Sequence, residues 1–172
     1  MPSGDRCEIR QARDGNDDDG VTALMVEYLT WANERLRTEY GIGESPADPA
    51  LERSKLAQYR RPRGLLLLAE VQGEAVGVGA LRWLDDAVAE VKRMYVRPPW
   101  RGAHVGSALL DGLLGEASER QAETVRLDTV RFMGDAQRLY RSRGFVERPP
   151  YEGTEIPPRL QQYWLFFERS GG

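Results

Sequence analysis

The chain has 172 residues, 41% hydrophobic and 30% charged, which is the length and composition of one soluble globular domain over residues 1–172. Its formal net charge of -3 argues against general nucleic-acid binding, which usually needs a basic domain. With one cysteine, Cys7, and one histidine, an internal disulfide and a Cys- or His-based metal cluster are excluded. Long apolar runs and an apolar signal core are missing, so we expect a cytoplasmic protein that does not bind membranes.

The N-terminal third predicts a tail, a strand and two helices. Residues 1–6 are expected to form a disordered tail, and Cys7–Ala12 a short strand. From Val21 to Thr38 apolar residues recur at helical spacing, which predicts an amphipathic helix. A turn-rich stretch ends this helix. Pro49 fits the first turn of a second helix that extends to about Tyr59.

In the middle of the chain, the apolar residues follow the pattern of β-strands rather than that of helices. Two apolar runs, Gly64–Val71 and Ala75–Leu84, predict a hairpin with its turn near Gly73. A third strand is expected over Ala87–Val96. Its alternation of apolar and polar residues is imperfect, which fits a β-bulge without requiring one.

The remaining third alternates between helix and strand. Helices are expected at about Val105–Arg120 and Met133–Gly144, and strands at Glu123–Thr129, Phe145–Arg148 and Gln162–Glu168. The whole order is strand, two helices, three strands, helix, strand, helix, two strands. This order predicts a single α/β domain whose mixed, mostly antiparallel sheet has about six to seven strands and is flanked by about four helices.

The segment Glu90–Leu110, EVKRMYVRPPWRGAHVGSALL, joins the end of a strand to the start of a helix through a glycine-containing turn. Such a turn presents free backbone N–H groups, and the helix dipole adds about half a positive charge, so a pyrophosphate can bind there. The glycines Gly102 and Gly106 would let the backbone approach the ligand. The alternative is that they only tighten the turn, and the spacing matches neither a Walker loop nor a dinucleotide fingerprint. Four basic residues surround the turn: Lys92, Arg93, Arg97 and Arg101.

Two segments resemble signature motifs of the GNAT superfamily of N-acetyltransferases. The pattern Arg/Gln-x-x-Gly-x-Gly/Ala is similar to the stretch from Arg101 to Gly106, and the pattern Ala-x-x-Leu-Tyr-x-x-x-Gly-Phe is similar to Ala136–Phe145. The sequence departs from the family at His104, which replaces a loop glycine, and at Met133, where many members have asparagine.

Two shorter stretches, Leu127–Thr129 and Arg148–Tyr151, are similar to a bacterial branch of small GNAT proteins of mostly unassigned substrate.

The resemblance implies a GNAT-like fold and acetyl-CoA as cosubstrate, with no metal. The CoA pyrophosphate would lie on the turn, the pantetheine arm would run beside the third meander strand, and that strand would splay from Glu123–Thr129 to admit it. Two arginines on the last helix would reach the nucleotide phosphates. The implied cofactor-binding residues are Met94, Tyr95, Val96, Arg101, Gly102, Ala103, His104, Val105, Gly106, Ser107, Arg138 and Arg143.

GNAT chemistry is direct attack of an amine on the thioester, and it implies two catalytic candidates. Tyr140 would protonate the leaving thiolate, since a phenol of reference pKa ~10 is protonated at neutral pH. The alternative is a core aromatic residue. Glu90 would be the base, because a carboxylate in an apolar run can have a raised pKa. The alternatives are a chain of water molecules as the base, and a solvated Glu90 paired with Lys92 or Arg82.

In the family, the first two helices and the loop near the last strands shape the acceptor site. Tyr28, Trp31 and Leu36 are expected in the core instead, and Tyr151 either in a loop that closes over substrate or in ordinary loop packing. Four acidic residues would favour a cationic amine, although a solvated helix face explains them equally: Glu27, Glu34, Glu39 and Glu44.

The function expected from all these features is acetyl-CoA-dependent transfer of an acetyl group to a primary amine of a small molecule or peptide. The alternative is a non-catalytic acyl-CoA-binding regulatory module of the same fold. A nucleotide-binding protein of another class fits less well, because both phosphate fingerprints are missing. We expect no nucleic-acid or membrane partner, and either a monomer or a homodimer.

Overall fold

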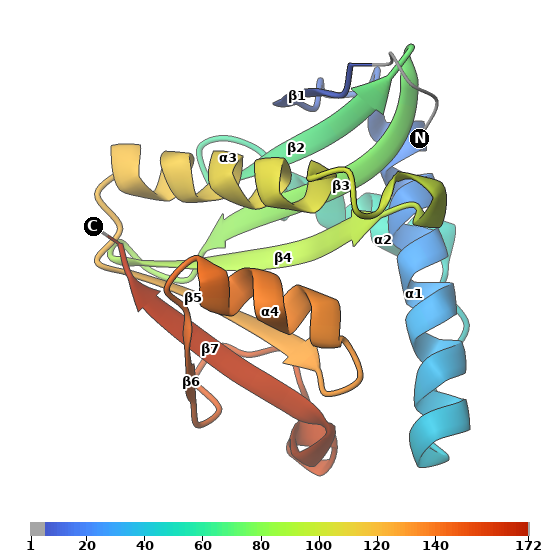
Figure 1. Cartoon of the computed structure of the whole chain (residues 1–172), viewed down its shortest axis with the longest axis vertical. Helices are drawn as coiled ribbons and strands as arrows, with labels where there is room; N and C mark the ends of the chain where they lie inside the picture. The colour runs from blue at the N-terminus through green and yellow to red at the C-terminus, as the bar shows by residue number, and fades with distance from the viewer. Residues whose placement is uncertain (1–5, 172) are drawn as a thin grey trace.

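A computed structural model describes residues 6–171 and shows a twisted seven-stranded sheet with helices on both faces (Figure 1). The tail expected at residues 1–6 lies outside the described residues except for Arg6. The strands are β1 (Glu8–Gln11), β2 (Gly64–Val71), β3 (Glu74–Trp83), β4 (Val88–Val96), β5 (Thr124–Val130), β6 (Val146–Arg148) and β7 (Trp164–Ser170). The α-helices are α1 (Asp18–Tyr40), α2 (Pro49–Ser54), α3 (Val105–Glu119) and α4 (Gly134–Ser142). Short 3-10 helices are η1 (Lys55–Tyr59), η2 (Pro98–Trp100) and η3 (Pro158–Tyr163).

The sheet order is β1-β2-β3-β4-β5-β7-β6, and β4 with β5 is its parallel pair. The predicted mixed, mostly antiparallel α/β fold is therefore confirmed. The second predicted helix is shorter than expected, because the α-helix ends at Ser54 and tightens into η1. Its start follows the expected chemistry, since Pro49 occupies the first turn and the Asp48 carboxylate accepts a hydrogen bond from the Ala50 N–H at 2.9 Å.

Strand β2 explains how the two faces of the sheet are covered. Its side chains alternate, so Leu65 and Leu67 pack in the core beneath α3, while Leu66 and Leu68 pack in the core beneath α1. Both faces of this strand are buried, which is why its sequence is a continuous apolar run. Figure 1 shows α3 and α4 on one face, with α1 and α2 on the other.

Strand β4 contains the bulge that its imperfect alternation allowed. Val78 pairs with Tyr95 and Ala80 pairs with Lys92, so two residues of β4 lie opposite Gly79. One of them, Arg93, has a φ of 56°. The bulge rotates the C-terminal end of β4 relative to its start.

Strands β4 and β5 pair only at their beginnings. The last registered pair is Glu90 with Arg126, after which both strands continue without pairing. The two strands therefore diverge toward the N-termini of α3 and α4. Within residues 6–171, no helix is both long and apolar enough to cross a membrane.

Candidate active site

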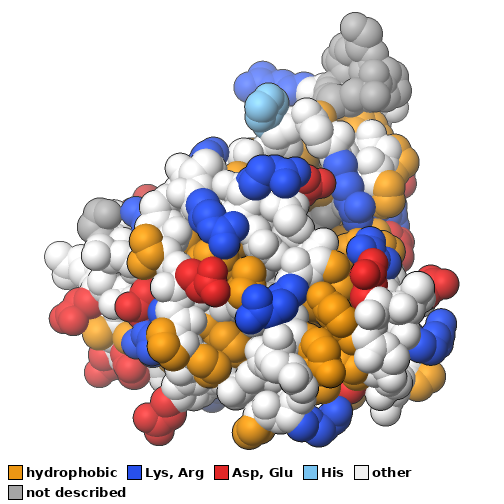
Figure 2. All heavy atoms as spheres, turned by 60° about the horizontal axis from the view of Figure 1, so that its bottom comes forward, with side chains coloured by type: hydrophobic (Ala, Val, Ile, Leu, Met, Phe, Trp, Pro, Cys, Tyr) orange, Lys and Arg blue, Asp and Glu red, His pale blue; other side chains and the backbone are white. Residues whose placement is uncertain are grey.

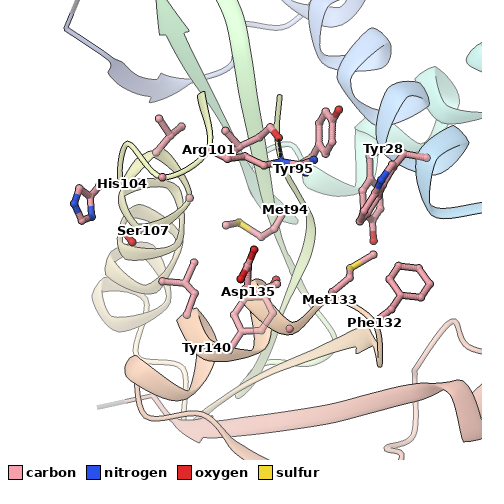
Figure 3. A pocket seen from close by; sticks show the side chains of 18 of the residues that line it. Tyr28, Met94, Tyr95, Arg101, His104, Ser107, Phe132, Met133, Asp135 and Tyr140 are labelled. Carbon is pink, nitrogen blue, oxygen red and sulfur yellow. Dashed lines mark hydrogen bonds between the residues drawn. The ribbon is translucent and has the colours of Figure 1, made fainter. Parts of the chain in front are cut away.

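A cavity of about 680 Å³ lies where β4 and β5 diverge, between α1 and the N-terminal ends of α3 and α4. Figure 3 shows His104 and Ser107 on one side of this cavity and Tyr28 and Phe132 on the opposite side. Met94 lies between the two sides. The lining residues that the sequence predicted are Met94, Tyr95, Val96, Arg101, Gly102, His104, Val105, Gly106, Ser107 and Tyr140.

The turn before α3 can present backbone N–H groups to an anion. The first hydrogen bond of the helix runs from the Ala108 N–H to the His104 carbonyl at 3.0 Å, so the amides of Val105, Gly106 and Ser107 precede the helical ladder. These residues line the cavity. The partial positive charge of the helix N-terminus is added at the same place.

His104 adopts a left-handed backbone conformation, with a φ of 61°. A residue with a Cβ is strained there by about 1–2 kcal/mol, which explains why a glycine suits this position of the motif. In Figure 3 the imidazole ring lies on the outer side of the turn, away from Met94 and Tyr140. The replacement of glycine by histidine therefore leaves the backbone amides open to the cavity.

The side chains around the turn do not form a broad basic surface. On the face shown in Figure 2, lysine and arginine side chains are interspersed with acidic and hydrophobic ones. Arg101 points inward, where its Nε donates to the Val96 carbonyl at 2.9 Å and its guanidinium lies 5.5 Å from the ring centre of Trp31. A small anionic ligand would thus meet local positive charge.

Tyr140 lies at the base of the cavity on α4. The side chain is buried, with 6% of the residue exposed, and its ring packs against Phe145 and Phe167. Burial raises the pKa of the Tyr140 phenol, and the neighbouring Tyr28 and Asp128 raise it further. The phenol is therefore protonated at neutral pH. Tyr140 is thus a packed aromatic residue with a protonated phenol that borders the cavity.

Glu90 is not among the residues that line this cavity. It is 0% exposed, its Oε1 accepts from Arg82 Nε at 2.7 Å, and its Oε2 accepts from the Tyr151 hydroxyl at 2.7 Å. The expected pairing is present, closely with Arg82 and at 3.9 Å with Lys92, but the expectation that such a paired Glu90 is solvated is wrong because the side chain is fully buried. Tyr151 is also buried and tied to Glu90, so its own contribution is packing of its loop against the sheet.

Lys92 links the diverging strands to the loop before β7. Its Nζ lies 3.4 Å from an Asp128 carboxylate oxygen, 3.3 Å from Glu155 and 3.9 Å from Glu90. Burial by itself lowers the pKa of Lys92, but the three carboxylates outweigh burial and raise it above its usual value. Lys92 therefore stays charged. No sequence pattern marks this cluster, because its members come from three separate segments.

Three residues predicted to bind the cofactor lie outside the cavity lining. Ala103 belongs to the turn but does not border the cavity. Arg143 Nε donates to Asp111 on α3 at 2.7 Å, and Arg138 forms an ion pair with Asp135 one turn earlier on α4. Both arginines already have carboxylate partners, so their expected contacts with the nucleotide phosphates remain predictions.

Asp135 itself lines the cavity and is exposed. Replacing it by asparagine is expected to tighten binding of CoA about twofold, because a carboxylate that repels phosphates is removed and Arg138 is released. The dissociation constant measured by titration checks this. Asp86→Asn, which makes the same charge change in the exposed β3–β4 turn, serves as the control. Equal affinities of Asp135→Asn and the unmodified protein would show that Asp135 does not face the phosphates.

The side of the cavity opposite the turn was not predicted. Tyr28, Trp31 and Arg35 of α1 line it together with Phe132 from the β5–α4 loop; we call these four residues the α1 wall. The expectation of a core position is wrong for Trp31, whereas Tyr28 both packs against the core beneath α1 and lines the cavity. Leu36 is buried as expected. The helical spacing of Tyr28 and Trp31 was visible in the sequence, but a core stripe has the same spacing.

The acidic residues expected to favour a cationic amine do not line this cavity either. Glu27 pairs with Arg97 at 2.7 Å, and Glu39 pairs with Arg35 at 2.7 Å. Glu44 lies 3.4 Å from a guanidinium nitrogen of Arg159 in η3. The hypothesis of a carboxylate-lined acceptor site is not supported by this cavity.

Known proteins resemble this chain in sequence and in fold. Residues 25–145 match the Acetyltransferase (GNAT) family. An uncharacterized N-acetyltransferase of Schizosaccharomyces pombe is 31% identical over 141 residues, covering 81% of this chain and 82% of that protein. An aminoalkylphosphonate N-acetyltransferase of Salmonella typhimurium is 32% identical over 146 residues, covering 82% and 86%. The fold resembles that of PaiA N-acetyltransferase of Thermoplasma acidophilum, crystallised with coenzyme A, with a TM-score of 0.71, 16% identity and coverage of 96% and 99%.

The divergent parallel strands, the amide-presenting turn and the cavity between them define a protein of the acetyltransferase class. The family match extends over more than half of the chain, and the two sequence relatives cover most of it. The chain belongs to the GNAT acetyltransferase family, whose members use acetyl-CoA.

Proposed function

We propose that this protein transfers the acetyl group of acetyl-CoA directly to a primary amine of a small molecule or peptide. The observation that supports this most is the continuity of one cavity, which joins the free amides before α3 to the buried phenol of Tyr140 along the bulged end of β4. An anion site, an unpaired strand edge and a proton donor are the parts that such a reaction needs.

The residues along the cavity have different roles in binding acetyl-CoA and in the reaction. The amides of the 101–107 turn hold the diphosphate, with Gly102 and Gly106 allowing close approach. The end of β4 pairs with β3 on one edge, and its other edge, which faces β5, offers backbone groups near Met94 and Val96 to the pantetheine arm. A backbone N–H near Tyr95 stabilises the oxyanion that forms when the amine attacks the thioester carbonyl.

Two proton transfers complete the reaction. Tyr140 donates its phenolic proton to the departing thiolate, which its raised pKa permits at neutral pH. We propose that the proton of the amine leaves through water in the cavity and that Glu90 is not the base, because both Glu90 oxygens are occupied and the residue is fully buried. The Salmonella relative is named for aminoalkylphosphonate acceptors, and that acceptor is not adopted for this chain.

Ligand-dependent thermal stability tests the cofactor part of this proposal. Acetyl-CoA or CoA at about 100 times its dissociation constant should stabilise the fold by about 2.7 kcal/mol, which raises Tm by roughly 5 °C or more for a domain of this size. ATP and NAD should have a smaller effect at the same concentration. If ATP or NAD stabilises the protein as much as CoA does, the site is a general nucleotide site and the proposal fails.

Two glycine-to-aspartate variants test whether the stabilisation by CoA depends on the turn before α3. Gly106→Asp places a carboxylate among the amides, where a new Cβ would meet only Leu139 at 3.7 Å and Val96 at 3.9 Å. We expect this variant to fold but to lose the stabilisation by CoA. Gly115→Asp puts the same charge on the exposed surface of α3 and should keep it. Release of CoA in the presence of a panel of primary amines then tests turnover.

A further inference from the structure

The α1 wall borders the cavity, but the proposed reaction assigns no role to its four residues. Tyr28, Trp31 and Arg35 are spaced by three and four residues, so they project from one side of α1. Phe132 meets them from the β5–α4 loop, with its ring edge-on to Trp31 at 5.9 Å. Figure 3 shows Tyr28 and Phe132 facing the cavity from the side opposite the α3 turn.

The aromatic rings of Trp31 and Phe132 contact the guanidinium group of Arg35. Its guanidinium carbon lies 4.7 Å from the ring centre of Phe132 and 5.9 Å from that of Trp31. Among the described contacts, the guanidinium donates a hydrogen bond from Nη2, so its other N–H groups can donate to a ligand. A carboxylate binds guanidinium through such N–H groups, with two parallel hydrogen bonds.

One protein carboxylate competes for Arg35. Glu39, one turn further along α1, accepts from Arg35 Nη2 at 2.7 Å. Both side chains are substantially exposed, at 39% and 43%, and an ion pair so open to solvent contributes little free energy. A carboxylate of a ligand inside the cavity can therefore share or replace this partner.

The charges that border the cavity favour an anion on this side. Arg101 lies over the ring of Trp31 at 5.5 Å, so positive charges approach this indole from two residues, Arg35 and Arg101. The acidic residue of the lining is Asp135 at the start of α4, and it is already paired with Arg138. The cofactor phosphates are assigned to the α3 turn across the cavity, which leaves Arg35 for the acceptor.

We propose that the acceptor is a small amine that carries a carboxylate, which Arg35 binds while the apolar part of the acceptor packs against Trp31 and Phe132. This inference rests on the proposed acetyl transfer, because it names the acceptor class of the same cavity. It excludes simple cationic amines as the preferred acceptors. Arg35 is thus a specificity residue that contacts the acceptor away from the reacting amine.

Matched pairs of amino acids and their amides test the proposal. The probes are phenylalanine, β-alanine and 3-aminobenzoate, each compared with its carboxamide, against protein saturated with CoA for binding and with acetyl-CoA for transfer. The ratio of acid to amide is compared between the unmodified protein and Arg35→Gln, so that differences in intrinsic amine basicity cancel. Arg37→Gln, an exposed change on the same helix, is the control variant.

We expect at least one acid to be preferred over its amide by tenfold or more, and Arg35→Gln to lower that ratio at least tenfold. Arg35→Lys should restore part of it, Arg37→Gln should leave it unchanged, and none of these variants should alter CoA affinity more than about twofold. If no acid in the panel is preferred over its amide, or if Arg35→Gln keeps the preference, the proposal is overturned.

The binding measurement separates this inference from the proposed function. Preferential binding of an acid through Arg35 without any transfer would support Arg35 as a carboxylate-binding residue and defeat the proposed acetyl transfer. Transfer to amines without preference for the acids would do the reverse.

Discussion

Replacing Tyr140 by phenylalanine is expected to lower kcat at least about 100-fold and to change the dissociation constant of acetyl-CoA less than threefold. A positioned general acid contributes roughly 10²–10⁴-fold to a rate, and phenylalanine removes the donating hydroxyl while keeping the ring that packs against Phe145 and Phe167. Steady-state release of CoA and a separate binding titration measure the two quantities.

The pH dependence and a control variant sharpen this test. Burial raises the pKa of Tyr140 above the ordinary phenol value of about 10, so ionisation of this residue should cause no loss of kcat between about pH 7 and pH 9. Tyr163→Phe makes the same chemical change beside Tyr40, outside the cavity lining, and should leave kcat unchanged. A Tyr140→Phe variant that keeps its full kcat would mean that the thiolate leaves without this acid.

Replacing Glu90 by glutamine is expected to lower the free energy of unfolding by about 3 kcal/mol, equivalent to a Tm lower by roughly 6 °C or more. The change removes one negative charge from a fully buried group that contacts Arg82 and lies 3.9 Å from Lys92. Both cations retain Glu155, which limits the loss. Denaturant unfolding measures the effect.

The same variant decides the role of Glu90 in the reaction. Because we propose that the amine proton leaves through water, kcat of folded Glu90→Gln should stay within tenfold of that of the unmodified protein. Glu147→Gln is the control, since Glu147 forms an exposed ion pair with Arg141 at 3.5 Å and should change stability by less than about 0.5 kcal/mol. Unchanged stability together with a 100-fold loss of kcat would establish Glu90 as the base instead.

The order of helices and strands could be predicted because the spacing of apolar residues differs between a helix and a strand. The continuous apolar run of β2 and the stripe of α1 identify a doubly buried strand and an amphipathic helix from local sequence alone. The end of α2 at Ser54 could not be predicted, because the change to a 3-10 helix depends on packing rather than on a proline or glycine.

Of the two sides of the cavity, the α3 turn could be predicted from the sequence and the α1 wall could not. The α3 turn is a backbone site, and glycine spacing before a helix marks such a site directly. The α1 wall depends on where the β5–α4 loop places Phe132, and nothing in the spacing of Tyr28 and Trp31 distinguishes a cavity wall from a core stripe. The partners of Lys92 likewise meet only in the folded chain, because Asp128 and Glu155 belong to a strand and a distant loop.

The bulge in β4 makes this one strand obey two opposite alternation rules. Before it, Ala89 and Val91 face the core beneath α3; beyond it, Met94 packs toward that core and Tyr95 toward the core beneath α1. If β4 kept all its residues but continued in regular pairing from Val91, Met94 would face the core beneath α1 and Tyr95 the core beneath α3, so the extra residue at the bulge is what places each side chain on its present side. Arg93 does not line the cavity, yet the bulge to which it belongs determines the side of the sheet to which each of these two lining side chains points.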